Sequence, residues 1–254
     1  MRYKLWAVGI GAGCLLLAVT EPPQKVEISK TESMDFAPGG VLRLTNSIGY
    51  LTVEGWDEPR LEITTIKSTK KEVATGDRAK ASAELDKVHV TVERKGNEAT
   101  IATDFPRHRA YPPPAPWGHA THFELEYHIR VPRDTRLIVA NHDVGEIYVE
   151  DLINDIDVHL VQGEVMLHLA EDGRYSIDAT SDFGNVNCDF PGEEKRRRWL
   201  TGHRWASEEK AGAHKLNLKV GYGDVVILKI RIPRTPAPAA GTSHSNAALR
   251  SNGL

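Results

Sequence analysis

The chain has 254 residues, and 32 lysines and arginines face 35 aspartates and glutamates, so its formal net charge is -3. This length predicts one or at most two domains with room for a hydrophobic core, which excludes a mini-protein held together by metals or disulfides. The nearly balanced charge excludes the strongly cationic surface that duplex nucleic acid requires, so no nucleic-acid partner is expected. The two cysteines cannot form a disulfide framework.

Residues 1–20 have the order of a secretory signal. Arg2 and Lys4 precede the uncharged apolar run Leu5–Val19, which is the charged and then apolar pattern of a signal peptide. The segment therefore predicts a signal peptide, with an uncleaved N-terminal anchor as the alternative, and an exported protein that is periplasmic or associated with the envelope. Acylation at Cys14 is disfavoured because it would leave only a short apolar stretch before the cysteine.

From Val26 to about Pro233 the chain alternates apolar and polar residues in short runs, which predicts an all-β domain over residues 26–233. One helix is expected over Thr75 to Leu85, where alanines stand among charged residues. Two loop insertions are expected, at 107–122 and 191–214. Residues 234–254 lack the apolar content to fold, which predicts a disordered tail.

A short repeat runs through this domain. A glycine is followed two and four positions later by apolar residues, as in Gly145-Glu-Ile147-Tyr-Val149. The last four of these glycines are separated by 18, 21 and 39 residues. The pattern recurs at Gly49, Gly145, Gly163, Gly184 and Gly223.

Such a unit has one apolar face and cannot bury it alone, so successive units are expected to stack and share one core. The fold predicted is an all-β, solenoid-like stack of the β-helix type with repeats of about 20 residues. A twisted β-sandwich is the alternative. Cys188 occupies the inward position held by Val149 and Leu167 in other units, so it is expected to act as a small hydrophobic residue.

Three segments resemble a known group. The first is the segment Leu44–Asp57, and the second is the helix-like segment Ala79–Leu85 before a Val-x-Val strand. The third is Ile129–Pro132, which is followed by the glycine repeats. Together they resemble the bacterial "putative adhesin" domain family over about residues 36 to 233. The resemblance implies a β-solenoid-like domain of exported or membrane-attached bacterial proteins, and it supplies no catalytic residues.

Acidic and polar side chains directly follow the repeat glycines: Glu146, Glu164, Asn185 and Asp224. If the units stack in parallel, these side chains form an outward column with a spacing of about 4.8 Å. Because like charges directly opposite each other are destabilising, the hypothesis is that Glu146, Glu164 and Asp224 bind a cation or that a register shift separates Glu146 from Glu164. A solvent-exposed acidic edge is the simpler alternative.

A segment rich in arginine and tryptophan is the best surface candidate for a partner. Arginine pairs with phosphates and carboxylates, and tryptophan adds amphipathic area. The expected partner is a protein, a glycan or a membrane surface in the cell envelope, and a solvated insertion is the alternative. The residues are Arg196, Arg197, Arg198, Trp199, Arg204 and Trp205.

The chain carries no phosphate-binding glycine loop, no Gly-x-Ser-x-Gly elbow and no His-Glu-x-x-His zinc motif. No catalytic residue, cofactor or resident metal is therefore expected. The leading hypothesis is a non-catalytic exported envelope protein that serves adhesion, scaffolding or protein contact. The alternative is a polysaccharide-acting enzyme of the β-helical type, with Asp155, Asp157, Asp178 and Asp182 as its nearest carboxylates.

Overall fold

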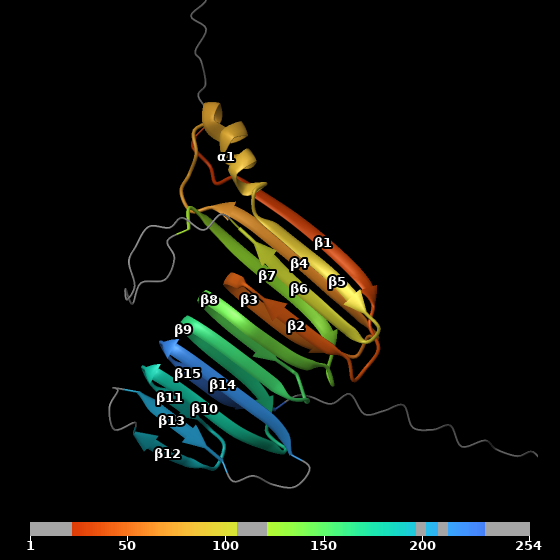
Figure 1. Ribbon diagram of the computed structural model, residues 1–254, viewed down its shortest axis with the longest axis vertical. Helices are drawn as coiled ribbons and strands as arrows, with labels where there is room; N and C mark the ends of the chain where they lie inside the picture. Colours follow the sequence, from red (N-terminus) through yellow and green to blue (C-terminus); the bar gives the residue numbers. More distant parts are fainter. Residues whose placement is uncertain (1–21, 106–120, 197–201, 208–212, 232–254) are drawn as a thin grey trace, which may run out of the picture.

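A computed structural model describes residues 22–105, 121–196, 202–207 and 213–231. Within them, fifteen strands form one mixed, unclosed sheet beside one short α-helix (Figure 1). The first seven strands are β1 (Glu27–Asp35), β2 (Val41–Thr45), β3 (Ser47–Trp56), β4 (Arg60–Thr69), β5 (His89–Lys95), β6 (Glu98–Asp104) and β7 (Phe123–Pro132). The others are β8 (Arg136–Glu150), β9 (Ile156–Ala170), β10 (Tyr175–Phe183), β11 (Val186–Cys188), β12 (Glu193–Arg196), β13 (His203–Ala206), β14 (His214–Tyr222) and β15 (Val225–Ile230).

The predictions of an all-β chain and of one helix are confirmed. A 3-10 turn (Thr75–Asp77) leads into α1 (Arg78–Leu85), the span where strong helix formers were expected. Only Leu85 of this helix is buried, so the helix contributes little to the core. Figure 1 shows α1 at one end of the molecule and β12 at the other.

The long strands β8 and β9 each take part in two ladders, because their first and second halves pair with different neighbours. One ladder runs β5–β6–β2–β8–β9–β14–β10–β13–β12, and the other runs β1–β4–β7–β3–β8–β9–β15–β11. The inward side chains of both ladders form one hydrophobic cluster. The two ladders therefore enclose a single core.

The passage from one ladder to the other is visible in the sequence of β9. Its buried residues alternate through Leu160, and the alternation resumes at Val165, five positions later. An odd spacing breaks the strand period of two. It lets side chains from both halves of β9 point into the same core.

The expectation that successive units stack in chain order is wrong for the last two units. β9 pairs with β14 and β15, whereas β10 pairs with β14 and β11 pairs with β15, so the unit of Gly223 lies between those of Gly163 and Gly184. The physical reason is apolar content. The buried inward residues of β14 and β15 are aliphatic up to Ile227, and among the inward positions only Lys229 at the end of β15 is exposed, whereas β10 and β11 contribute Ser181 and the half-buried Cys188. The more apolar unit takes the inner place, where more area is removed from water.

The segment expected as a loop insertion at 191–214 contains two strands. β12 and β13 form an antiparallel pair, and β13 extends the sheet beyond β10. Trp205 lies opposite Ala179 in this pairing and packs against the core, so the hairpin covers the end of the sheet. The insertion expected at 107–122 lies outside the described residues except at its last two positions.

No helix among the described residues is long and apolar enough to cross a membrane. The predicted signal peptide or anchor at 1–20 and the predicted tail at 234–254 lie outside the described residues.

Candidate functional site

The repeated glycines lie side by side on adjacent strands. They form one edge of the stacked units, where the chain passes between the ladders. Gly145 is in register with Gly49 on one side and with Gly163 on the other. All five glycines have φ between +96° and +153°. A Cβ on Gly163 would lie 1.7 Å from the carbonyl oxygen of Gly145. No L side chain fits there, so glycine is required where the backbones of adjacent strands approach this closely.

Two glutamates stand next to these glycines and face each other. Glu146 and Glu164 are paired in register on the parallel strands β8 and β9, without the register shift that was the alternative. The irregularity in this pairing lies earlier, between Val139 and His142. Neither carboxylate has a hydrogen bond or ion pair with another residue in the described part of the chain. The Cα atoms of the two glutamates therefore lie about 5 Å apart, and no described lysine or arginine forms an ion pair with either carboxylate, although Lys70 also lines the groove.

Asp224, the third member of the expected acidic column, has a different environment. Its Oδ1 accepts a hydrogen bond of 2.7 Å from the backbone N–H of Asn185 and one of 3.3 Å from the side-chain amide of Asn185. Asp224 thus joins the last two units of the sheet. The structure groups no three His, Cys, Asp or Glu side chains at metal-binding distance among its described residues.

A groove with a volume of about 410 Å³ opens over this edge. Tyr50 follows Gly49 as Glu146 follows Gly145, and it is in register with Glu146. Its ring is 47% exposed. The polar side chains that line the groove are Tyr50, Lys70, Thr121, Glu124, Glu146, Gln162 and Glu164.

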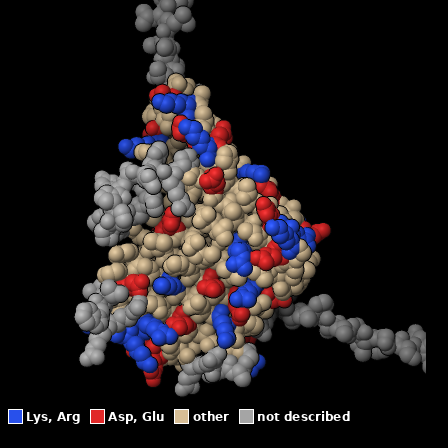
Figure 2. Space-filling view, viewed as in Figure 1, with Lys and Arg blue, Asp and Glu red and all other residues tan. Residues whose placement is uncertain are grey.

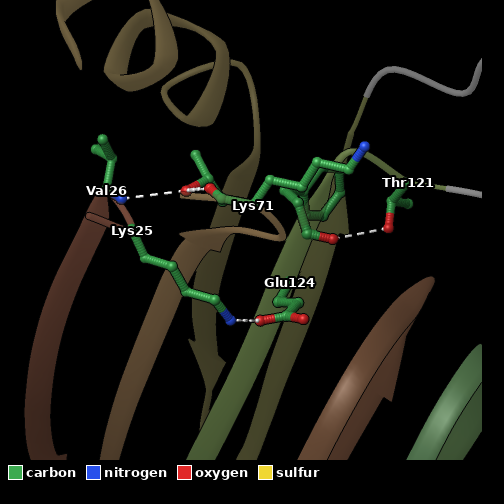
Figure 3. Close-up of polar contacts among 7 residues, drawn as sticks. Lys25, Val26, Lys71, Thr121 and Glu124 are labelled. Atoms are coloured by element: carbon green, nitrogen blue, oxygen red, sulfur yellow. Dashed lines mark hydrogen bonds and ion pairs between the residues drawn. The ribbon is translucent and has the colours of Figure 1, made fainter. Parts of the chain in front are cut away.

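An ion pair holds one rim of the groove. Lys25 Nζ lies 2.8 Å from Glu124 Oε2, and this hydrogen bond raises the pKa of Lys25. Nearby, Thr69 Oγ1 accepts from the backbone N–H of Val26 at 3.1 Å and donates to the carbonyl of Lys71 at 2.8 Å (Figure 3). These contacts fasten the residues before β1 to β4 and β7.

A further hydrogen bond at the rim of the groove lies at the start of β7. Thr121 Oγ1 donates to the carbonyl oxygen of Phe123 at 2.8 Å (Figure 3). Both residues line the groove. The rim on the side of β7 is therefore held by hydrogen bonds as well as by the sheet.

A buried polar pair supports the floor. The Nε2–H of His142 donates to the carbonyl of Gly49 at 3.0 Å, so Nδ1 accepts from the hydroxyl of Ser47 at 2.8 Å. Burial lowers the pKa of His142 to about 4. Ser47 and His142 are 1% and 0% exposed, so this hydroxyl–imidazole pair has no access to a substrate. Its role is structural.

The segment rich in arginine and tryptophan is not gathered into one surface by the residues described. Arg196 is exposed at the end of β12, whereas Arg197, Arg198 and Trp199 lie outside the described residues. The guanidinium of Arg204 binds both carboxylate oxygens of Asp178, at 2.9 and 2.7 Å. Trp205 is half-buried against the core. Contact of this segment with a partner stays a prediction.

The carboxylates considered for an enzyme lie on the other ladder and have partners of their own. Asp155 Oδ1 accepts from the backbone N–H of Lys215 at 2.8 Å, and Asp157 accepts weakly from Asn217 at 3.4 Å. Asp178 binds Arg204, and Asp182 also has an interaction. They stabilise strand ends and neighbouring strands.

The groove can hold an organic cation. Two carboxylates in register attract an ammonium or guanidinium group, and an exposed tyrosine ring next to them offers a face for a cation–π contact. Sequence reasoning identified the glutamates but missed Tyr50. The signal was present, because Tyr50 holds the position after a repeat glycine.

Comparison with known proteins gives a structural likeness only. No protein family model and no curated protein matches this chain. A putative cell adhesion protein from Clostridium sporogenes is 15% identical and has a TM-score of 0.46, with 80% of this chain and 100% of that chain covered. A putative adhesin from Bacteroides fragilis is 8% identical over 79% of this chain and 97% of that chain, with a TM-score of 0.24. A putative adhesin from Parabacteroides merdae is 11% identical over 80% of this chain and 81% of that chain, with a TM-score of 0.25. All three are bacterial proteins described in terms of adhesion, as is the family that the sequence resembles.

Proposed function

We propose that this chain is a non-catalytic, exported bacterial envelope protein whose β-solenoid-like domain serves adhesion or scaffolding by contacting a protein partner. The contact surface in this proposal is the groove of Tyr50, Glu146 and Glu164, and the recognised groups are lysine or arginine side chains. The proposed export rests on the N-terminal sequence. The proposed solenoid rests on the parallel pairing of five units that each begin with a glycine at the same place.

The observation that carries the proposal is the row formed by the three groove residues. Tyr50, Glu146 and Glu164 stand in register on three adjacent parallel strands. Like charges directly opposite each other cost about 0.2–1 kcal/mol in a sheet. A cation bound between the glutamates removes this cost and forms charge-assisted hydrogen bonds in its place.

The surroundings of the row favour binding in a fixed geometry. The strands that carry it are in the middle of their ladder, and the pair of Ser47 and His142 holds β3 to β8 beneath it. A preorganised site loses little conformational entropy when a ligand binds. This favours recognition by a rigid surface.

The experiment is calorimetric titration of the full chain with a lysine-rich peptide and with a serine-substituted version of the same peptide. We expect heat with the first peptide only. Glu146→Gln combined with Glu164→Gln should weaken the affinity about tenfold or more, because two charge-assisted contacts are lost.

The matched control removes two exposed carboxylates at the far end of the sheet, with Asp35→Asn and Glu93→Gln. It should leave the affinity unchanged. Equal losses in the two double variants would show that only net charge matters and would overturn the groove as the contact surface. Release of reducing sugar from bacterial polysaccharide by the full chain would instead favour the enzyme alternative.

A further inference from the structure

A second cavity lies on the edge of the sheet away from the repeated glycines. It has a volume of about 760 Å³. The turn between β9 and β10, the residues that follow β11, and strands β12 and β15 form its walls. Lysine and arginine side chains gather, together with some acidic ones, at the end of the molecule where β12 and β13 lie (Figure 2).

Arg174 and Lys229 supply positive charge to this cavity. Arg174 and Lys229 are exposed and have no ion pair with a described carboxylate. The acidic residues at the cavity are already paired, because Glu171 binds Arg231 at 3.0 Å and Glu193 binds Lys195 at 3.2 Å. Among the described side chains that line the cavity, Arg174 and Lys229 are therefore the charges outside ion pairs, and Asp189 lies beside Lys229, whose backbone N–H donates to its carboxylate at 3.1 Å.

The cavity wall fixes one of these cations. Lys229 Nζ lies 5.0 Å from the centre of the Phe190 ring, within the range of a cation–π contact. Phe190 packs edge-on against Tyr175, with ring centres 5.4 Å apart. The aliphatic stem of Lys229 and the two rings thus form a continuous wall.

An unsatisfied hydrogen-bonding group belongs to the same wall. Tyr175 lines the cavity and is only 8% exposed. Its hydroxyl lies beside the backbone of Ala170 but has no hydrogen-bonding partner of ordinary geometry among the described residues. The hydroxyl is enclosed beneath the turn at Gly173, so the Tyr175 ring shapes the wall of the cavity but offers no hydrogen bond to a ligand.

The character of the cavity selects the kind of ligand. Its volume is in the range of sites for small organic molecules, about 300–1,000 Å³, and larger than a single inorganic anion needs. The large exposed hydrophobic residues of the described chain are Tyr50, Ile153, Val161 and Phe183, and none of them lines this cavity. A bilayer or a protein hot spot requires such apolar anchors. A ligand rich in hydroxyl groups and bearing negative charge does not.

We propose that this cavity binds an acidic oligosaccharide, whose carboxylate or sulfate groups pair with Arg174 and Lys229. This site is separate from the groove of Glu146 and Glu164 and does not depend on it.

The test titrates the full chain with three probes: a sulfated hexasaccharide, an oligogalacturonate, and vesicles that contain phosphatidylglycerol. We expect binding of at least one oligosaccharide that weakens as the salt concentration rises. Arg174→Gln combined with Lys229→Gln should lower the affinity about tenfold or more. The matched control, Arg94→Gln combined with Lys95→Gln on β5, should change it less than about twofold.

A charge-conserving variant, Arg174→Lys combined with Lys229→Arg, should retain binding, which separates loss of charge from loss of folding. Equal losses in the cavity variant and the β5 control would overturn the proposal, since binding would then follow net charge. No binding of either oligosaccharide would also overturn it. Binding of the vesicles alone, with the same dependence on Arg174 and Lys229, would assign the cavity to a lipid headgroup instead.

Discussion

Glu146 and Glu164 lie directly opposite each other on parallel strands, and neither forms an ion pair with a described residue. In an ordinary sheet, pairs of like charge are avoided because each costs free energy. Here the pair stands at the edge of a groove, where the cost can be recovered when a cationic group binds. The arrangement therefore makes predictions for the free protein as well as for binding.

Without a ligand, Glu146→Gln should raise the free energy of unfolding by about 0.5 kcal/mol, because it removes the repulsion from Glu164. Urea unfolding at low and high salt measures the effect, which should shrink as salt screens the charges. The control, Glu93→Gln on β5, removes a carboxylate that lies 3.8 Å from Lys95 and should bring no gain. A loss of stability in Glu146→Gln would contradict the repulsion.

Gly163→Ala should be strongly destabilising. The residue has φ of +136°, and its new Cβ would lie 1.7 Å from the carbonyl oxygen of Gly145. Backbone strain of this kind costs about 1–3 kcal/mol, and the clash adds to it. Thermal unfolding should show a lower midpoint for this variant. Gly76→Ala, where the Cβ would meet no atom within 4 Å, should be close to neutral.

The stability of the protein should fall as the pH drops below about 6.5. His142 has its pKa lowered to about 4 by burial. Between pH 6.5 and pH 4 the imidazole is protonated in the unfolded chain but neutral in the folded one. The stabilisation from His142 is therefore fully present above about pH 6.5 and is lost as the pH falls toward 4. The total contribution is about 3 kcal/mol.

The measurement is urea unfolding at a series of pH values for the wild type, His142→Gln and His89→Gln. The variant at His142 should lack this part of the pH dependence, although it is less stable overall because the buried contacts to Ser47 and Gly49 change. His89 is exposed on β5 and its variant should follow the wild type. Parallel curves for the wild type and His142→Gln would refute the assignment.

Cys188 should react slowly with thiol reagents in the folded protein. Burial raises its pKa to about 11, so the thiolate fraction at pH 8 is about one in a thousand. In a Cys14→Ser background, the rate with a disulfide reagent should rise at least about tenfold when urea unfolds the chain. Equal rates in the folded and unfolded states would show that the thiol is not protected.

The sequence predicts the local features of this fold well. The strand period of two and the recurring glycine identify the β units, and the position after the glycine identifies Glu146 and Glu164 as neighbours. These features can be predicted because both patterns depend only on residues that are close together in the sequence. The same pattern contains Tyr50, which was overlooked because its side chain is not acidic.

Long-range pairings could not be predicted in this way. The unit of Gly223 lies between those of Gly163 and Gly184 because its inward residues are more apolar, a comparison that requires knowing which strands compete for the inner place. Lys25 and Glu124 are 99 residues apart and meet only because β4 lies between β1 and β7 and pairs with both. The bond from Arg204 to Asp178 depends likewise on the pairing of β13 with β10.

The most direct test of the groove as the contact surface is an amide chemical-shift titration of the full chain with the lysine-rich peptide. The account predicts that the largest shifts occur at Tyr50, Gly145, Glu146, Gly163 and Glu164, and that Glu146→Gln with Glu164→Gln abolishes them. Largest shifts at Arg196, Arg204 or Trp205, or shifts that persist in the double variant, would contradict it.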